Sequence, residues 1–342
     1  MTPERPASAR PWKKPEWAAG LFWPVLALAL LLAFNLAFTP GFFTLVVRGG
    51  RLYGTLVDIL NHGSKVGIVA IGMTLVIATG GVDLSVGAVM AICGAIAASM
   101  SVHNAAPFPV IILCSLGAGL VAGLWNGILV SRFRIQPIVA TLVLMVAGRG
   151  VAQLMTDGLI ITFQDSRLAF FAGGSVLGLP FPVTLAVGVL LAVILLTRRT
   201  ALGLFIESVG DNEQASRFSG LDSRGITLLV YAMSGLCAGF AGLIEASYIK
   251  AADANNAGLF VELDAILAVV IGGTALTGGR FYLVGAVIGA LFIQTLTQTM
   301  YMRNVSADVA PVPKALVVVL VCLLQSPVMR AKLLGAWKRG RA

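Results

Sequence analysis

Residues 84–131 form an unbroken run without aspartate, glutamate, lysine or arginine. This run is about twice as long as the ~20 apolar residues that one helix needs to cross a bilayer. The residues around Pro107 are expected to break it, so the run predicts two membrane helices. Composition agrees with a lipid-facing surface, since 58% of the 342 residues are hydrophobic and 11% are charged, whereas soluble domains carry roughly 25% charged residues. We expect an all-α, polytopic membrane protein.

The other apolar runs are separated in the same way by charged or turn-forming residues. The first, over residues 17–47, is expected to end its helix near Phe38, and it is too long to be the core of a cleaved signal peptide. The run over residues 66–82 is extended by an amphipathic stretch before it, and the run over residues 265–279 is short. The expected total is ten membrane helices, and the remaining five cover residues 137–156, 180–197, 225–249, 281–302 and 312–329.

The placement of basic residues predicts the orientation of these helices. With ten spans both ends of the chain share one side, and sixteen of the 24 lysine and arginine residues fall on that side. Cytoplasmic loops are enriched in these residues, so both ends are expected in the cytoplasm. We expect a cytoplasmic tail over residues 1–16, a transmembrane domain over residues 17–329 with a large cytoplasmic loop over about 198–225, and a basic cytoplasmic tail over residues 330–342.

The net charge of +9 does not indicate a nucleic-acid partner. The basic residues lie between apolar runs, without the interleaved aromatic residues that a nucleic-acid groove needs. The chain contains none of the motifs G-x-x-x-x-G-K-[ST], H-E-x-x-H or G-x-S-x-G. We therefore expect no catalytic residue, metal or cofactor on this chain. The four cysteines lie in apolar runs and are expected to be core residues; they are Cys93, Cys114, Cys237 and Cys322.

Glycines at four-residue spacing predict close helix packing, because helices in lipid gain little from burying apolar surface against one another. They are Gly119, Gly123 and Gly127, then Gly235 and Gly239, then Gly285 and Gly289. In addition, Thr-Gly-Gly at residues 79–81 and again at 277–279 is followed at the same distance by Val-Gly-Ala-Val. This similarity is either the remnant of an internal duplication or a coincidence in a glycine-rich chain.

The loop over residues 198–225 combines charges of both signs with Phe205 and Phe218. Asp211-Asn212 is expected to cap a short helix that ends at Gly220. Such a helix across a loop can dock another protein. The alternative is a connection that is only solvated.

Several polar side chains lie within or beside the expected spans, where a charge costs about 2.5–3.5 kcal/mol and needs a partner or water. Asp83 and Asp264 are interpreted either as helix N-caps or as pathway residues. Arg149 is expected either to brace the bundle or to line a pathway. The amides that are candidates both for sugar binding and for hydrogen bonds between helices are Asn126, Gln136, Gln153, Gln294 and Gln298, with Trp125 beside Asn126.

The chain resembles the ribose-type sugar ABC transporter permeases. The likeness is carried by residues 71–88, 122–127, 135–141, 207–215 and 252–280, and it extends over about residues 50–330. Residues 146–154 and 252–259 are most similar to the permease subunits of bacterial galactofuranose importers. One departure is Ser216, where the family often has alanine, which is expected to matter little.

This resemblance implies a permease of the ribose/vitamin B12 type in a bacterial inner membrane, which moves a monosaccharide. Two permease subunits, identical or related, would form the pathway, and a periplasmic sugar-binding protein would deliver the cargo. Cytoplasmic ABC ATPase subunits would carry ATP and magnesium. They would dock on a coupling segment with Glu207, Gly210, Asn212, Ala215 and Gly220.

Two other functions are considered. The first alternative is an ion-coupled secondary sugar carrier, which would need no ATPase. The chain lacks the series of carboxylates and histidines that a proton relay uses, which argues against a proton-coupled carrier but not against a sodium-coupled one. The second alternative function is that of an intramembrane enzyme or a structural scaffold. The absence of catalytic motifs argues against the enzyme.

Overall fold

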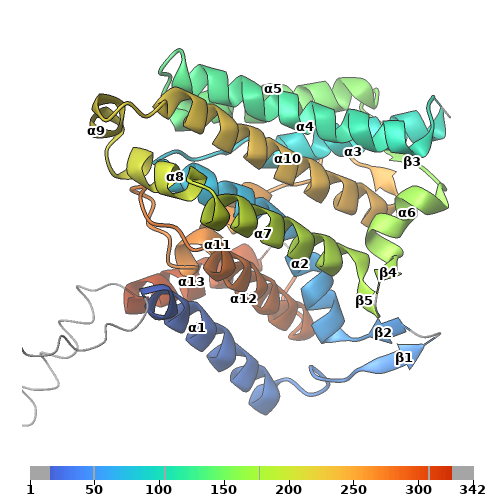
Figure 1. The fold of residues 1–342 in the computed structure, drawn as a ribbon. Helices are drawn as coiled ribbons and strands as arrows, with labels where there is room; N and C mark the ends of the chain where they lie inside the picture. The colour runs from blue at the N-terminus through green and yellow to red at the C-terminus, as the bar shows by residue number, and fades with distance from the viewer. Residues whose placement is uncertain (1–15, 49–50, 104, 177, 307–308, 326–342) are drawn as a thin grey trace, which may run out of the picture.

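The computed structural model describes residues 16–48, 51–103, 105–176, 178–306 and 309–325, and most of these are helical (Figure 1). The helices are α1 (Glu16–Phe38), α2 (Thr55–Ala78), α3 (Val86–Val102), α4 (Phe108–Ser131), α5 (Pro137–Met155), α6 (Ser166–Gly173), α7 (Phe181–Arg199), α8 (Leu202–Asp211), α9 (Glu213–Phe218), α10 (Ser223–Ile249), α11 (Val261–Ile271), α12 (Leu283–Met302) and α13 (Pro311–Gln325). The strands are β1 (Val46–Arg48), β2 (Arg51–Tyr53), β3 (Ile161–Thr162), β4 (Ser175–Val176), β5 (Leu179–Pro180) and β6 (Ala251–Ala252).

Nine of the ten expected membrane helices have a counterpart among the described helices, and the tenth, over residues 265–279, is only overlapped by the shorter α11. Seven of the described helices are long and apolar enough to cross a membrane: α1, α2, α4, α5, α7, α10 and α12. The first helix ends at Phe38 as predicted, and α2 begins at Thr55, so the amphipathic stretch before residue 66 is helical. The tail predicted over residues 330–342 lies outside the described residues, as do residues 1–15 of the N-terminal tail.

The predicted bounds of the helix over residues 265–279 are wrong. Helix α11 ends at Ile271, and the residues after it form turns. Gly273, Gly278 and Gly279 have φ of +91°, +91° and +92°. Glycine reaches these left-handed conformations without steric cost, and they end a helix.

The two ends of the bundle differ (Figure 1). Helices α8 and α9 lie at one end, which we call the α8–α9 end, and α1 begins and α13 ends near it. The opposite end, called the strand end, carries α6 and the antiparallel pairs β1–β2, β3–β6 and β4–β5. The described ends of the chain therefore lie on the same side as the loop over residues 198–225.

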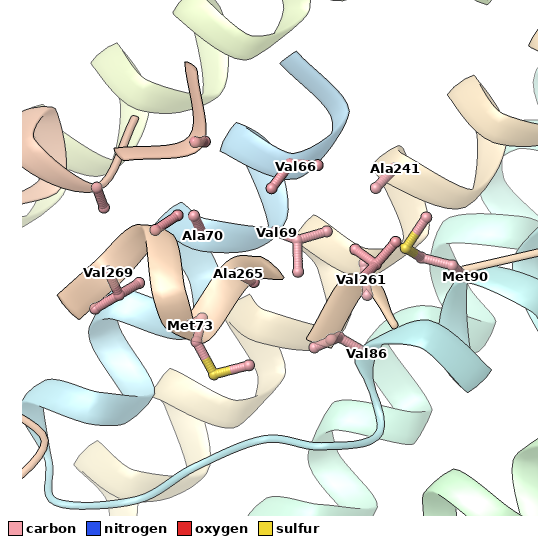
Figure 2. Close-up of a cluster of buried hydrophobic side chains, with 14 of the residues drawn as sticks. Val66, Val69, Ala70, Met73, Val86, Met90, Ala241, Val261, Ala265 and Val269 are labelled. Carbon is pink, nitrogen blue, oxygen red and sulfur yellow. The ribbon is translucent and has the colours of Figure 1, made fainter. Parts of the chain in front are cut away.

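Helix α2 occupies the centre of the bundle. In its membrane-spanning window 78% of the residues are buried, against 22% in α7. Val66, Val69 and Met73 of α2 pack with Val86 of α3 and Val261 of α11 in the cluster shown in Figure 2. Helix α2 is also less hydropathic than α1 and α7, whose spanning windows are only 11% and 22% buried and which would face lipid.

Glycines bring α4 and α10 into backbone contact. A Cβ built on Gly119 would lie 2.6 Å from the carbonyl oxygen of Gly235. A Cβ on Gly123 would overlap the carbonyl oxygen of Tyr231 and lie 3.0 Å from the Cα of Ala232. On the other side of α2, Gly285 and Gly289 of α12 meet the backbone of Gly272 and Ala268 in the same way. The predicted small-residue packing is therefore confirmed.

Two of the three described cysteine side chains are buried, namely Cys93 and Cys237. The core prediction is wrong for Cys114, which is exposed. Helix α4 is peripheral, with 28% of its spanning window buried, so an apolar residue on it can face outward. The side chain of Cys322 lies outside the described residues.

We predict that Gly123→Val forces α4 away from α10. The added carbons would overlap backbone atoms, which cannot rotate aside as a side chain can, and overpacking typically costs about 1–3 kcal/mol. The melting temperature of the detergent-solubilised chain should fall, as measured by size-exclusion chromatography after heating. Gly117→Val in the same helix is the control, because a Cβ at Gly117 meets open space. Equal melting temperatures for the two variants would contradict the packing.

Candidate functional site

The α8–α9 hairpin presents one face to the bundle and another to the outside. Ile206 and Val209 of α8 are buried in a cluster with residues of α2, α7 and α10. Helix α9 is capped as predicted: the Ala215 N–H donates to Asn212 Oδ1 at 2.9 Å. Phe218, at the end of α9, is 92% exposed. An apolar side chain so exposed at the end of the bundle is a candidate contact for another protein.

Gly210, near the end of α8, lies where the two Thr-Gly-Gly turns meet. A Cβ on Gly210 would overlap the carbonyl oxygen of Ala78 and lie 2.5 Å from the nitrogen of Gly279. That nitrogen donates its N–H to Ala78 O at 2.9 Å. A Cβ on Gly278 would lie 2.8 Å from Gly210 O and 3.0 Å from the nitrogen of Gly80. The backbones of α8, the end of α2 and the α11–α12 connection thus touch without a side chain between them.

Two other residues of the predicted coupling segment support the shape of the hairpin. The carboxylate of Glu207 lies 3.8 Å from the guanidinium of Arg198 at the end of α7. Gly220 has φ +85°, a left-handed conformation that lets the chain turn from α9 toward α10. Together with Asn212 and Ala215, these residues fix the path of the chain around Gly210.

Asp83 and Asn126 meet in a buried polar cluster. Asp83 Oδ1 accepts from the Ser85 hydroxyl at 2.6 Å, and its Oδ2 accepts from the Ser234 hydroxyl at 2.8 Å. Asn126 Nδ2 donates to Ser85 Oγ at 2.8 Å. These four side chains are at most 1% exposed. The cluster ties the α2–α3 connection to α4 and α10, and in this conformation it is closed to any solute.

The N-cap interpretation is wrong for Asp83 and Asp264. The N-caps of α3 and α11 are Ser85 and Phe260. Asp264 instead lies in the first turn of α11 and accepts from Lys314 Nζ of α13 at 2.5 Å. A carboxylate within a span is thus paired with a cation, as the cost of burying charge requires.

Gln136 lies at the α8–α9 end of the bundle. It is the N-cap residue of α5 and is exposed. With Arg134, Arg217 and the turn at Thr79 it lines a cavity of about 330 Å³. This cavity opens beside the contact of Gly210 with the glycine turns.

Arg149 and Gln153, one turn apart on α5, both reach the connection between α10 and α11. Arg149 Nη1 donates to the carbonyl oxygens of Ala254 and Ala257 at 3.1 and 2.5 Å. Gln153 Nε2 donates to Asn255 Oδ1 at 2.7 Å. The structure thus brings these two predicted residues together, and none of their hydrogen bonds in the described part of the chain reaches the cluster around Asp83.

Contacts between residues far apart in the sequence were missed by sequence reasoning. Lys65 of α2 forms an ion pair with Glu245 of α10, and His62 lies 2.9 Å from the Tyr248 hydroxyl. In the sequence, Lys65 precedes one apolar run and Glu245 lies near the end of another. These positions show that each charge needs a partner, but they do not show that the two residues pair with each other. The contact of the two Thr-Gly-Gly turns was missed for the same reason.

Comparisons with known proteins identify the family. The family model described as "Branched-chain amino acid transport system / permease component" matches residues 55–324. The galactofuranose transporter permease protein YtfT of Escherichia coli K12 is 51% identical over 326 residues, which cover 95% of each chain. The fructose import permease protein FruF of Bifidobacterium longum is 38% identical over 348 residues, covering 100% of this chain and 97% of that protein.

The ribose import permease protein RbsC of Escherichia coli K12 is 38% identical over 306 residues, which cover 88% of this chain and 92% of that protein. No solved structure matches the chain. The family model covers most of the sequence and these relatives align along nearly all of it. The chain therefore belongs to the family of branched-chain amino acid transport system permease components.

Proposed function

We propose that this chain is the membrane-spanning permease subunit of an ABC sugar importer in a bacterial inner membrane. The observation that carries the proposal is 51% identity to a galactofuranose permease along 95% of both chains. The cargo would be a monosaccharide, with a galactofuranose-like sugar favoured over another hexose or pentose. The named relatives give no support to an ion-coupled secondary carrier.

The α8–α9 end would face the cytoplasm, in line with the basic residues assigned to that side. Cytoplasmic ABC ATPase subunits would dock there and carry ATP and magnesium, while this chain binds neither. A periplasmic sugar-binding protein would dock at the strand end. A second permease subunit, identical or related, would complete the pathway.

The coupling role of residues 207–220 is supported by the contact at Gly210. Closure of the ATPase pair on ATP would displace α9 and α8. Because the Gly210 backbone meets the backbones of Ala78, Gly278 and Gly279 directly, the displacement would reach the ends of α2 and α12 without being absorbed by side-chain rotation. Of the pathway candidates, Arg149 and Gln153 would face the cargo route, whereas Asp83 and Asn126 would hold the helices in register.

The proposal is tested by reconstitution. Proteoliposomes that contain this chain, the ATPase subunits and the binding protein encoded beside it should accumulate radiolabelled sugar only when ATP is enclosed with the ATPase. Galactose, fructose and ribose would be assayed separately. Uphill accumulation by the chain alone, driven by a sodium or proton gradient, would overturn the proposal in favour of a secondary carrier.

We predict that Gly210→Val lowers sugar uptake at least tenfold, because the added carbons overlap the backbone of Ala78. Membrane insertion and ATPase co-purification should persist, since neither needs this contact. Gly188→Val in α7 is the control, because a Cβ there meets open space. Normal sugar uptake by Gly210→Val would contradict a coupling role for this contact.

Removing the N-cap of α9 tests the coupling role of residues 207–220 with a smaller structural change. Asn212→Ala removes the acceptor for the Ala215 N–H, which typically costs about 1 kcal/mol. Uptake should fall while insertion is unchanged, and Asn212→Asp, which keeps the acceptor, should restore it. Equal uptake by the alanine and aspartate variants would count against a coupling role for α9.

We also predict that Phe218→Ala weakens ATPase binding. The side chain is 92% exposed, so its loss should leave the melting temperature of the chain unchanged. The amount of ATPase recovered in a pull-down with the solubilised chain should fall several-fold. Phe43→Ala, which alters an exposed aromatic residue before β1, is the control, and equal recovery with both variants would exclude Phe218 from the docking surface.

A further inference from the structure

The connection between α10 and α11 is an interrupted span. Helix α10 ends at Ile249, and after β6 the residues 253–260, which we call the half-span segment, contain no helix. Helix α11 then has 11 residues, so it is about 16 Å long. This is about half of the ~30 Å hydrocarbon core, so the half-span segment must supply the rest of the crossing.

Contacts place this segment inside the bundle. A Cβ on Gly258 would lie 2.6 Å from the carbonyl oxygen of Gly87, the second residue of α3. Ala254 and Ala257 accept hydrogen bonds from Arg149. Arg149 lies six residues before the end of α5, which is about 9 Å along that helix. The half-span segment therefore descends from the strand end to well within the span.

Irregular backbone at this depth is stable only where it is buried in protein or lines a water-filled cavity. Arg149 satisfies two of the segment's carbonyl groups, and Asp253 Oδ1 accepts the N–H groups of Asn255 and Asn256. The side chains of Asn255 and Asn256 are nevertheless exposed, and Phe260 is 58% exposed. Because two exposed carboxamides are costly against lipid, this face is unsuited to lipid contact, and an aqueous cavity between two permease subunits would satisfy it.

Three amides on this face, Gln153, Asn255 and Asn256, form what we call the amide face. Gln153 Nε2 donates to Asn255 Oδ1 at 2.7 Å, and Asn256 Nδ2 donates to Asp253 Oδ2 at 2.8 Å. Within the described part of the chain, no hydrogen bond uses Gln153 Oε1, Asn256 Oδ1 or Asn255 Nδ2. Two acceptors and one donor thus remain available, a combination that suits hydroxyl groups, which both donate and accept.

The electrostatics favour a neutral ligand. The free groups are carboxamides, and the nearby guanidinium of Arg149 is directed to the carbonyl oxygens of Ala254 and Ala257. An anionic solute would find no free cation in this hydrogen-bond network. The exposed ring of Phe260 adds the apolar surface that packs against the C–H face of a sugar ring.

We propose that the amide face and Phe260 form a weak subsite for a neutral monosaccharide partway through the membrane. The inference rests on the proposed transport function and adds the residues that contact the cargo. Arg149 holds the half-span segment in place and does not bind the sugar. A second permease subunit opposite this face would enclose the route.

The first experiment measures uptake in the reconstituted complex. Radiolabelled galactose, fructose and ribose are tested first with the unaltered chain. With each sugar that enters, Asn255→Ala/Asn256→Ala should lower the uptake rate at least tenfold, while ATP hydrolysis stimulated by the binding protein stays within twofold. Gln164→Ala, which removes an exposed amide before α6, should transport normally. Normal uptake by the double variant would overturn the subsite, whereas absence of ATP-dependent uptake by the unaltered chain would overturn the proposed function instead.

The second experiment does not depend on transport. Asn256→Cys is introduced together with Cys114→Ser and Cys322→Ser, which leaves the buried Cys93 and Cys237 as the other thiols. A membrane-impermeant thiosulfonate should modify position 256 in the assembled complex, and the sugar that is taken up should slow this modification severalfold. Failure of the reagent to reach position 256, or a rate that no sugar changes, would contradict an aqueous sugar subsite there.

Discussion

The contact of Gly210 with two glycine turns joins the parts of this protein that would have to move together in the proposed transport cycle. Its neighbours are the last residue of α2, the most buried of the long helices, and the connection that leads from α11 to α12. Since backbones touch here, a shift of α8 displaces both elements. The interrupted span that bears the amide face begins at the other end of α11. The contact at Gly210 thus connects the proposed ATPase-docking surface on α8 and α9 to the elements that flank the proposed sugar route.

The buried cluster around Asp83 explains how such a shift could stay coordinated. Its hydrogen bonds tie the α2–α3 connection to α4 and α10, and separating these helices would leave buried polar groups unpaired at about 1–3 kcal/mol each. The glycine contacts between α4 and α10 act in the same direction. Helices α2, α3, α4 and α10 are therefore expected to move as a unit, with the change of shape concentrated in the less regular segments.

The sequence predicted most helices because a span needs a long apolar run, and proline, glycine or charge ends it. Phe38 and the break near Pro107 are examples. The bounds of α11 were predicted wrongly because the residues after Ile271 are apolar enough to look like part of a span, although their glycines adopt left-handed conformations. Arg149 and Gln153 were identified as polar residues within a span. Their partners around Asn255 could not be, because more than a hundred residues separate them and only the folded bundle brings them together.

If Gly210 transmits the ATPase stroke, nucleotide binding should change the environment of the amide face through this residue. The modification rate of a thiol introduced by Asn256→Cys would be compared with and without a non-hydrolysable ATP analogue in the fully assembled complex. The analogue should change this rate several-fold, and adding Gly210→Val should abolish the response while the ATPase subunits remain bound. The same nucleotide response in both backgrounds would contradict transmission through this contact.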